Sequence, residues 1–553
     1  MSRTEKETVN LVRAIYQNHK NYWKNSASLM RKLKHTYETR QFEDITFDPT
    51  NIRVEIADGY AFIEGYIASL FSKFPAVEVG KDSVRKGNDA VVKALANRWL
   101  YDQRQVLENA SRLALIYPNA FFKLAPRESS IIFDKISVRP VPPWEVIVDN
   151  DASKWSEQRY VGHVYWCPVA KAKGIFGNKK YTPVVKADYF EQEAHPYKTA
   201  QDEDIPDEYK YIEVVELYDL VYDCLYFWSP NYNGGEKLLD EISPIPVRTY
   251  DDVPLPPLVP LYYSRIPDSP MEGYSSLYRI YDQIFEKNIV RSFWANAIRR
   301  DSRQYLYKEG QIDEDALAKI TAGVDGAMIA VDADSLDGLI KVVEVPPLST
   351  NFDRYLAAIE SDLQRGSVLA PFTRGEATKA TATEVAALAN YTASEIGKMA
   401  RERDEAIELM SQIYIRMLVD LLKSEDAEDT VIADGEVYRV TAEKLEGKFR
   451  FAASDQSNTP VASVMKRNEL IQLLPVLQGL GIDPSKIKEQ VIRQFDLPKS
   501  FGEEPPPAAP PQAQNIPQVA PTEEPEPALP AEQLAQQLAQ SVPTPEVATP
   551  ERM

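Results

Sequence analysis

The chain has 553 residues, of which 44% are apolar, a formal net charge of −20 at pH 7, and two cysteines, Cys167 and Cys224. A chain of this length can bury a sizeable core and should divide into several units. The charge argues against tight, salt-sensitive binding to a phosphate backbone, which requires Lys and Arg. It suits either plain solubility or a surface past which DNA moves without sticking. The cysteines have neither metal-ligand spacing nor enough partners for a disulfide framework, as is typical of a reducing cytosol. We find no signal peptide and no apolar segment long enough to span a membrane.

The first half predicts an α+β unit, a helical base with a β insertion. Apolar residues recur at steps of three and four in the predicted helices and alternate in the predicted strands. Helices are expected over residues 9–37, at the periphery, within 51–74, and over 90–117; strands are expected over 76–79, 120–124, 144–149, 159–165, 211–218 and 223–228, and after the turn at 233–235.

A proline-rich stretch at 244–270 separates this unit from a strong helix predicted over 274–300. That helix has apolar residues on more than one face, so we expect it to be covered on several sides. A compact insert follows, with a strand at 303–307, a helix at 313–322 and strands at 327–331 and 341–345. An amphipathic helix at 351–363 then returns the chain, which places the insert at the tip of a helical hairpin.

A loop over 365–380 leads into a long helix over 381–422. Gly366, Gly375 and many small residues favour a mobile loop. Thr381 and Glu384 have the spacing of a capping box at the start of the helix. The helix would span roughly 60 Å, and Gly397 is the expected kink point. A long helix in an ordinary helical domain is the plainer interpretation of the same pattern.

The C-terminal tail has a different composition from the rest. Thirteen of the forty prolines follow residue 500, and residues 501–553 hold eight Glu and one Arg. Such a segment buries too little apolar surface to offset chain entropy, so we expect disorder from about Gly502. The segment 531–540 either stays disordered or forms a short helix on a partner.

The order of these parts resembles the portal proteins of tailed bacteriophages, over residues 51–422. The family has no short invariant signature, so the likeness rests on local patterns in the right order. These patterns are the apolar helix and Val-x-Val strand at 66–79, the strand at 144–149 followed by 159–167 and a helix ending near Phe176-Gly177, the sequence GYSSLYRIYDQIFEKN at 273–288, and the Thr-rich segment 375–384.

The resemblance implies a portal fold assembled as a ring. Its expected parts are a wing (1–263), a first stem helix (264–300, helical from 274), a clip (301–349), a second stem helix (350–364), a tunnel loop (365–380), a long kinked wing helix (381–423), a C-terminal wing with a helical crown at 461–495 (424–500), and the tail (501–553). The implied site residues are Arg365, Val368, Leu369, Phe372, Arg374 and Lys379 in the DNA-channel loop, Tyr281, Ile284, Asn288, Trp294, Phe352 and Leu356 in the stem, and Thr381 and Glu384 at the wing-helix cap.

The same resemblance implies a function. Portals form a ring of twelve copies at one capsid vertex, nucleate procapsid assembly, dock the terminase, conduct the genome during packaging and ejection, and connect head to tail. The expected partners are the major capsid protein, the scaffolding protein, the terminase large subunit, a head-tail adaptor protein and double-stranded DNA passing through the channel, with no membrane and no cofactor. The expected location is the virion, after assembly in the host cytoplasm. Arg365, Arg374 and Lys379 would touch phosphates transiently, unless they pair with neighbouring carboxylates.

Enzymatic interpretations have little support. The sequence contains no Walker loop, Gly-x-Ser-x-Gly, His-Glu-x-x-His or Rossmann fingerprint. Its four histidines, His19, His35, His163 and His195, are scattered. Asp149-Asn150-Asp151 suggests a turn rather than a cation loop, although a hydrolase using paired carboxylates is compatible with the many acidic residues. We expect no enzyme. A low-order adaptor or scaffold that binds partners through its proline-rich tail is the alternative.

Overall fold

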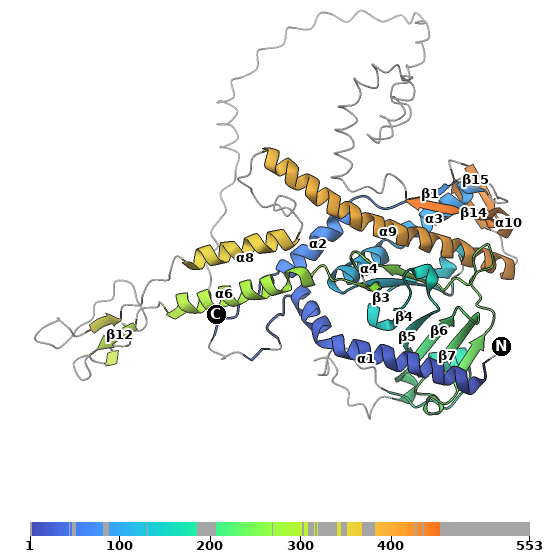
Figure 1. Ribbon diagram of the computed structural model, residues 1–553, viewed down its shortest axis with the longest axis horizontal. Coiled ribbons are helices and arrows are strands. Elements are labelled where there is room, and N and C mark those ends of the chain that lie inside the picture. The colour runs from blue at the N-terminus through green and yellow to red at the C-terminus, as the bar shows by residue number, and fades with distance from the viewer. Residues whose placement is uncertain are drawn as a thin grey trace, which may run out of the picture. The chain divides into compact units, whose positions relative to one another are not determined.

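The computed structural model describes residues 3–43, 45–46, 51–80, 88–129, 131–184, 206–267, 269–300, 304–307, 314–315, 318, 340–343, 351–367, 382–425, 429–433 and 436–453. Over these residues the chain mixes helices with antiparallel sheets, which is compatible with the predicted α+β class (Figure 1). The expected crown at 461–495 and tail at 501–553 lie outside the described residues.

The first helix, α1 (Glu5–Tyr37), confirms the helix predicted over 9–37. The Thr4 hydroxyl accepts a hydrogen bond from the Glu7 amide at 3.4 Å, and the Glu7 carboxylate accepts one from the Thr4 amide at 2.9 Å, which forms a capping box. One face of α1 is buried along its length and the opposite face is exposed, as expected of a helix at the periphery. The buried side chains are Val9, Val12 and Tyr16 in a cluster at the five-stranded sheet, and Trp23, Met30 and Leu33 in the main core.

Three shorter helices follow: α2 (Asp58–Leu70), α3 (Asp89–Asp102) and α4 (Arg104–Ile116). The prediction of a single helix over 90–117 is wrong, because Gln103 separates two helices. The Gln103 amide donates to the Leu100 carbonyl at 3.0 Å, and its own carbonyl accepts from the Leu107 amide at 3.0 Å. Gln103 therefore ends α3 and begins α4, and the bend allows Trp99 and Leu107 to enter the same core.

Two antiparallel sheets have the strand orders β3-β2-β9 and β4-β5-β6-β7-β8. The strands are β2 (Ala120–Pro126), β3 (Ile136–Val141), β4 (Val146–Val148), β5 (Tyr160–Pro168), β6 (Tyr211–Asp219), β7 (Cys224–Trp228), β8 (Leu238–Ile242) and β9 (Leu258–Leu261). The strands predicted between residues 120 and 242 are confirmed, and so is the helix α5 (Val169–Phe176), which ends at Gly177 with a φ of +85°. In contrast, β9, β10 (Arg265–Ile266) and β11 (Ser269–Gly273) lie in the proline-rich stretch, for which the sequence predicts no strand.

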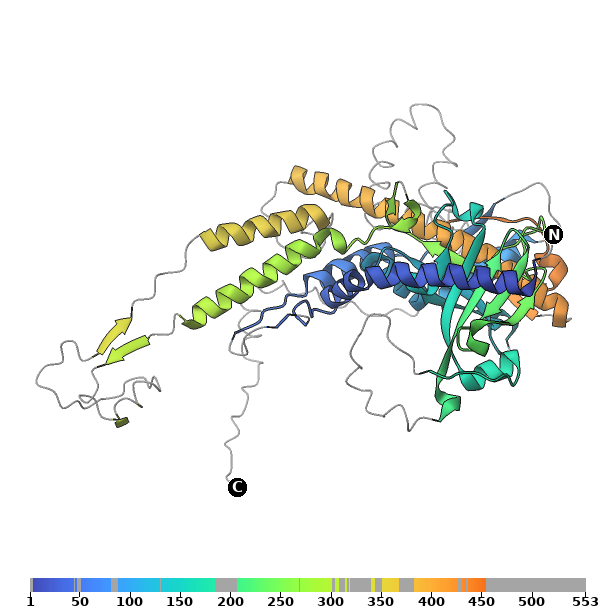
Figure 2. The ribbon, with the colours of Figure 1, turned by 60° about the horizontal axis from the view of Figure 1, so that its bottom comes forward.

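The longest helix, α9 (Ala382–Glu425), has 44 residues and spans roughly 66 Å. Figures 1 and 2 show it as one uninterrupted helix that contains Gly397, the expected kink point. A Cβ atom built on Gly397 meets no heavy atom within 4 Å, so close packing does not require a glycine at this position. The apolar face of α9 lies in the main core, where the Tyr414 ring stacks on Trp99 with the ring centres 4.2 Å apart.

Arg403 of α9 is a buried cation, only 1% exposed. Its guanidinium pairs with the adjacent Asp404 carboxylate at 2.7 Å and donates to the carbonyl of Leu70, the last residue of α2. The carbonyls of the last helical turn have no partner within their own helix and carry a partial negative charge. Arg403 therefore caps α2 from within the core and fixes α9 against it.

The last described strand pairs with the first strand of the chain. After α9 come the hairpin β14 (Asp429–Ala433) and β15 (Glu436–Val440), the short helix α10 (Ala442–Leu445) and β16 (Arg450–Ala453). β16 pairs antiparallel with β1 (Val77–Gly80), with Val77 opposite Ala453. The sequence predicts the strand at 76–79 but not its partner, which comes more than 350 residues later in the chain.

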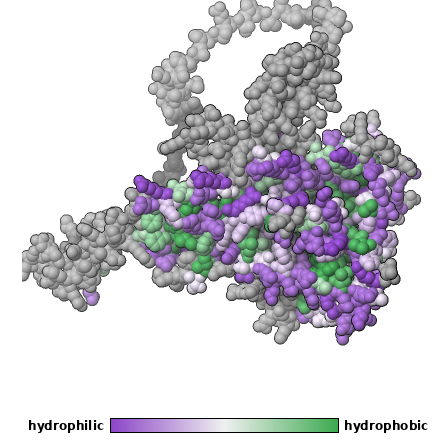
Figure 3. All heavy atoms as spheres, viewed as in Figure 1, coloured by the Kyte–Doolittle hydropathy of each residue, from purple (hydrophilic) through white to green (hydrophobic). Residues whose placement is uncertain are grey.

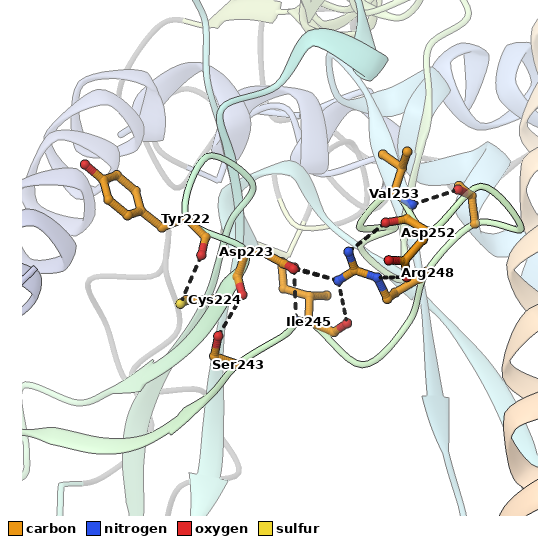
Figure 4. Close-up of polar contacts among 9 residues, drawn as sticks. Tyr222, Asp223, Cys224, Ser243, Ile245, Arg248, Asp252 and Val253 are labelled. Atoms are coloured by element: carbon orange, nitrogen blue, oxygen red, sulfur yellow. Dashed lines mark hydrogen bonds and ion pairs between the residues drawn. The ribbon is translucent and has the colours of Figure 1, made fainter. Parts of the chain in front are cut away.

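A loop centred on Arg248 makes polar contacts with the β6–β7 turn, as Figure 4 shows, and also with α9. The Arg248 guanidinium contacts both carboxylate oxygens of Asp223, at 2.8 and 2.7 Å, and also that of Asp252 at 2.6 Å. The Arg248 carbonyl accepts a hydrogen bond from Arg416 of α9 at 3.0 Å. One arginine thus joins the β6–β7 turn, its own loop and the long helix.

A buried polar network connects the two sheets. Lys123 of β2 donates to the Glu216 carboxylate of β6 at 2.6 Å and to the Tyr218 hydroxyl at 3.0 Å. His163 of β5 lies 2.6 Å from an Arg139 guanidinium nitrogen of β3. Burial, followed by the nearby Lys123 and Arg139 charges, lowers the pKa of His163 well below its ordinary value. The Glu145 and Glu216 carboxylates are farther from the imidazole, at 3.7 and 4.0 Å.

This network predicts a loss of stability in mild acid. His163 is neutral in the folded chain, whereas an exposed His has a pKa of about 6.5, so the unfolded chain binds one more proton as the pH falls below that value. The free energy of unfolding should therefore decrease as the pH drops from about 6.5 towards the folded pKa of His163. In H163Q this decrease should be smaller, as measured by urea denaturation at pH 7.5 and 5.0. Equal pH dependence in both proteins would contradict the assignment.

Candidate functional site

Two helices form an antiparallel pair at the site that the sequence predicts. They are α6 (Tyr281–Arg300) and α8 (Asn351–Ser367), which lie side by side in Figures 1 and 2. The Phe293 ring stacks on the Phe352 ring with centres 5.7 Å apart, and the Lys287 ammonium lies 3.6 Å from the Glu360 carboxylate. Phe293, late in α6, thus contacts Phe352 at the start of α8, whereas Lys287, earlier in α6, contacts Glu360 later in α8. The two helices are therefore antiparallel.

The first helix of the pair begins later than predicted. The sequence predicts a helix from residue 274, but α6 begins at Tyr281 after a short 3₁₀ turn, Tyr278–Ile280. The reason lies in Ser275, whose hydroxyl donates to the Ile116 carbonyl at 2.7 Å and accepts from the Tyr278 amide at 3.1 Å. These bonds hold the preceding residues against the end of α4 and prevent them from joining the helix.

The predicted stem residues all lie on this helix pair. Ile284 and Asn288 are fully buried, and Tyr281 stacks on Phe285. Trp294, Phe352 and Leu356 are half-buried. Asn288 has a role that the sequence did not indicate, because its carboxamide binds the backbone of a distant segment.

Residues 52–56, which we call the strap, run along α6 in extended form. The amides of Ile52, Val54 and Ile56 donate to the side-chain oxygens of Asn296, Ser292 and Asn288 at 2.8, 2.9 and 3.0 Å, respectively. The Asn296 amide group also donates to the Ile52 carbonyl at 2.8 Å, and the Ser292 hydroxyl to the Val54 carbonyl at 3.3 Å.

The spacing of alternate residues along the strap matches the spacing of every fourth residue along α6. Two residues of an extended chain advance by about 6.6 Å, and four residues of a helix advance by about 6 Å. Alternate strap amides therefore meet every fourth residue of α6, and the pairing satisfies backbone groups that a sheet would otherwise satisfy. These hydrogen bonds between the strap and α6, which we call the ladder, join the region after α1 to the first helix of the pair.

Large apolar side chains of the pair remain exposed in the single chain. Ile289, Phe293 and Ile298 of α6 are 45%, 57% and 57% exposed, and Tyr355 of α8 is 50% exposed. Ile289 and Phe293, four residues apart, share one face of the helix, whereas Ile298 lies on another. Figure 3 shows apolar surface over this helix pair among the hydrophilic side chains. Our expectation that α6 is covered on several sides is thus not met within one copy of the chain.

The second helix of the pair extends beyond its predicted end. α8 continues to Ser367, three residues into the range expected for the tunnel loop, so Arg365 lies in the helix. Arg365 is exposed, with its guanidinium 3.5 Å from the Asp362 carboxylate one turn earlier, as in the alternative in which it pairs with a neighbouring carboxylate. Gly366 also belongs to the helix, where an added Cβ would come within 2.8 Å of the Ile280 side chain. Close packing, rather than loop mobility, accounts for this glycine.

The other loop and cap residues are only partly described. Val368, Leu369, Phe372, Arg374, Lys379 and Thr381 lie outside the described residues, and Glu384 lies in the first turn of α9. Of the insert, β12 (Gln304–Tyr307) pairs antiparallel with β13 (Ile340–Val343), and residues 314, 315 and 318 are helical. These elements agree with the strands predicted at 303–307 and 341–345, while the strand predicted at 327–331 lies outside the described residues.

Other kinds of site find little support. The carboxylates of Asp149 and Asp151 both pair with Arg159, at 2.7 Å each, and the Asp149 oxygen also accepts from the Asp151 amide, which confirms the turn. This pairing lowers the pKa of Asp149. The described part of the chain has no group of three or more His, Cys, Asp or Glu that could hold a metal ion. None of its helices combines the length and apolar character needed to cross a bilayer.

Comparisons with known proteins add no relative. No protein-family model matches the chain, and no curated protein matches it. The functional argument therefore rests on the residues and their geometry.

The ladder predicts a graded loss of stability along α6. Asn288→Ala should lower the free energy of unfolding by about 2–4 kcal/mol, because it leaves the Ile56 amide unpaired and opens a cavity. Asn296→Ala, at a partly exposed position, should cost about 1–2 kcal/mol. Asn10→Ala, at an exposed position of α1, is the matched control and should have little effect. Urea denaturation measures all three, and equal stability of N288A and N10A would refute the role of the ladder.

Proposed function

We propose that the chain is the portal subunit of a tailed bacteriophage. Twelve copies would form a ring at one capsid vertex that nucleates procapsid assembly, docks the terminase large subunit, conducts the genome during packaging and ejection, and connects head to tail. In this proposal α6 and α8 are the stem, residues 301–349 the clip, residues 368–380 the tunnel loop and α9 the wing helix.

The observation that carries the proposal is the helix pair itself. Two antiparallel helices, with an inserted β-pair between them in sequence, expose Ile289, Phe293 and Ile298 on more than one face. A monomer gains nothing by exposing these side chains, whereas neighbours on both sides of each copy would bury them. When each copy contacts the next through two different surfaces, and the rotation between copies divides a full turn evenly, the repeated contacts form a closed ring.

The charge supports the conduit part of the proposal. A net charge of −20 disfavours adhesion of DNA to the protein, which suits a channel through which DNA must move. The expected channel cations Arg374 and Lys379 follow the exposed Arg365 at the end of α8. Few cations in an acidic surround would allow brief phosphate contacts without tight binding.

The remaining assignments follow from the same proposal. The chain would act in the virion after assembly in the host cytoplasm. It would contact the major capsid protein, the scaffolding protein and a head-tail adaptor protein, and would carry out no catalysis of its own.

Charge placed on the exposed helix faces should prevent assembly. The double variant I289E/I298E should remain a single subunit in light scattering, whereas the unaltered chain and I175E should have roughly twelve times the subunit mass. Ile175 of α5 is 54% exposed, close to the 45% and 57% of the two test positions, so the control carries the same substitution at similar exposure. Circular dichroism should show all proteins folded. A monomeric unaltered chain would favour the adaptor interpretation, and a double variant that forms rings would exclude these faces from the interface.

Removal of the loop should separate assembly from conduction. Deletion of residues 368–378 should leave rings intact, since the helix pair is untouched, but should impair genome packaging or retention. Ring mass comes from light scattering, and DNA content comes from nuclease-protected DNA in particles assembled with the variant. Normal packaging and retention by the deletion variant would refute the assignment of the tunnel loop.

A further inference from the structure

A pocket of about 500 Å³ lies between α1, the start of β2, β4 and the residues that follow β10, away from the buried contacts of the helix pair. Its floor is apolar and buried, with Phe121, Val146 and Met271 each at most 2% exposed. Tyr22 and Tyr278 stand at its rim and are 42% and 41% exposed. Exposed tyrosines around an apolar hollow are typical of surfaces that bind another molecule.

Three of the residues that line this pocket, Asn119, His19 and Glu272, can accept hydrogen bonds. Asn119 is 6% exposed, and its side-chain oxygen has no hydrogen-bond partner in the described part of the chain. Its amide group is hydrogen-bonded to the Tyr262 hydroxyl, which opposes the rise in the pKa of Tyr262 caused by burial. An unpaired buried oxygen costs about 1–3 kcal/mol, but this oxygen has almost no accessible surface, so a ligand in the pocket would reach it only after a movement of the pocket wall.

His19 provides a second acceptor. Its Nε2 lies 2.8 Å from the Trp144 carbonyl, so Nε2 carries the proton and Nδ1 has a free lone pair. Burial lowers the pKa of His19 to about 4, which keeps the ring neutral near pH 7. Lys20 contributes to this shift but does not line the pocket.

A carboxylate completes the set. Glu272 lines the pocket and is hydrogen-bonded to the Tyr22 hydroxyl. Burial, followed by the Glu272 charge and this hydrogen bond, raises the pKa of Tyr22 to about 12. Gly273, which follows Glu272, packs against the start of β2, because an added Cβ would come within 3.2 Å of Asn119 and within 1.7 Å of the Pro118 carbonyl. Asp149 and Asp151 also line the pocket, but Arg159 neutralises them. The lining contains neither Lys nor Arg.

We infer that this pocket receives an arginine or lysine side chain presented by a partner polypeptide. A guanidinium or ammonium group can donate to the His19 and Glu272 acceptors, its alkyl stem suits the apolar floor, and the tyrosine faces at the rim attract a cation. Charge complementarity favours a basic segment over an acidic one, which excludes the Glu-rich proline segment at 503–511 as the occupant. This inference does not depend on the proposed ring.

The test compares two peptides of the same shape. Acetyl-Phe-Arg-amide should bind the full chain at least tenfold more tightly than acetyl-Phe-citrulline-amide, whose side chain is uncharged, as measured by isothermal titration calorimetry. Glu272→Gln and Tyr278→Ala should each weaken binding of the arginine peptide at least fivefold. Glu241→Gln, an exposed carboxylate of β8 outside the pocket, is the control and should leave binding unchanged.

Three results would overturn the inference. Equal affinity for the two peptides would show that charge is not recognised. Equal weakening by E241Q and E272Q would show that the peptide binds through general attraction to an acidic protein. Binding of free agmatine as tightly as the arginine peptide would identify a small amine, rather than a partner polypeptide, as the occupant. Because Tyr278 is exposed, Y278A keeps the test decisive even if E272Q fails to fold.

Discussion

Burial of the apolar face of α9 is the constraint on which the rest of this fold depends. Ile407, Met410 and Ile413 are almost fully buried in a core that also receives side chains from α1, α2, α3, α4 and β16. Each fully buried side chain of this kind contributes roughly 1.5–3 kcal/mol. A helix of 44 residues has no stability of its own that would compare with this burial. The elements around α9 are therefore held in place by the same surface that holds α9.

Polar groups then fix how these elements join. Arg403 caps α2 from within the core, Arg248 ties the β6–β7 turn to α9, and Lys123 links the two sheets. Arg403 and Lys123 are buried, and such buried charges add little net stability when they are paired, but loss of one partner is costly. The ladder between the strap and α6 follows the same logic with neutral groups. It satisfies backbone amides through side chains, so the first helix of the pair is aligned by hydrogen bonds as well as by packing.

The sequence predicts the elements whose signal is local. Helical spacing identifies α1, α2, α8 and α9, and alternation identifies β5, β6 and β7. Its errors have physical reasons that depend on distant residues. Gln103 ends one helix and starts another because both apolar faces must reach one core, and Ser275 is held out of α6 by the end of α4. The pairing of β1 with β16 and the ladder of Asn288 join segments far apart in sequence, and no local pattern encodes such a partner.

The candidate site likewise combines features that the sequence predicts with features that only the structure shows. Apolar residues on more than one face of α6 indicate that the helix needs cover, but only the structure shows that a single chain leaves Ile289, Phe293 and Ile298 about half exposed. One partner surface can bury a single apolar patch. Exposed apolar side chains on two faces of one helix require two partner surfaces. An isologous dimer would bury only one of these faces. In the ring that we propose, neighbours on both sides of each copy would bury both faces.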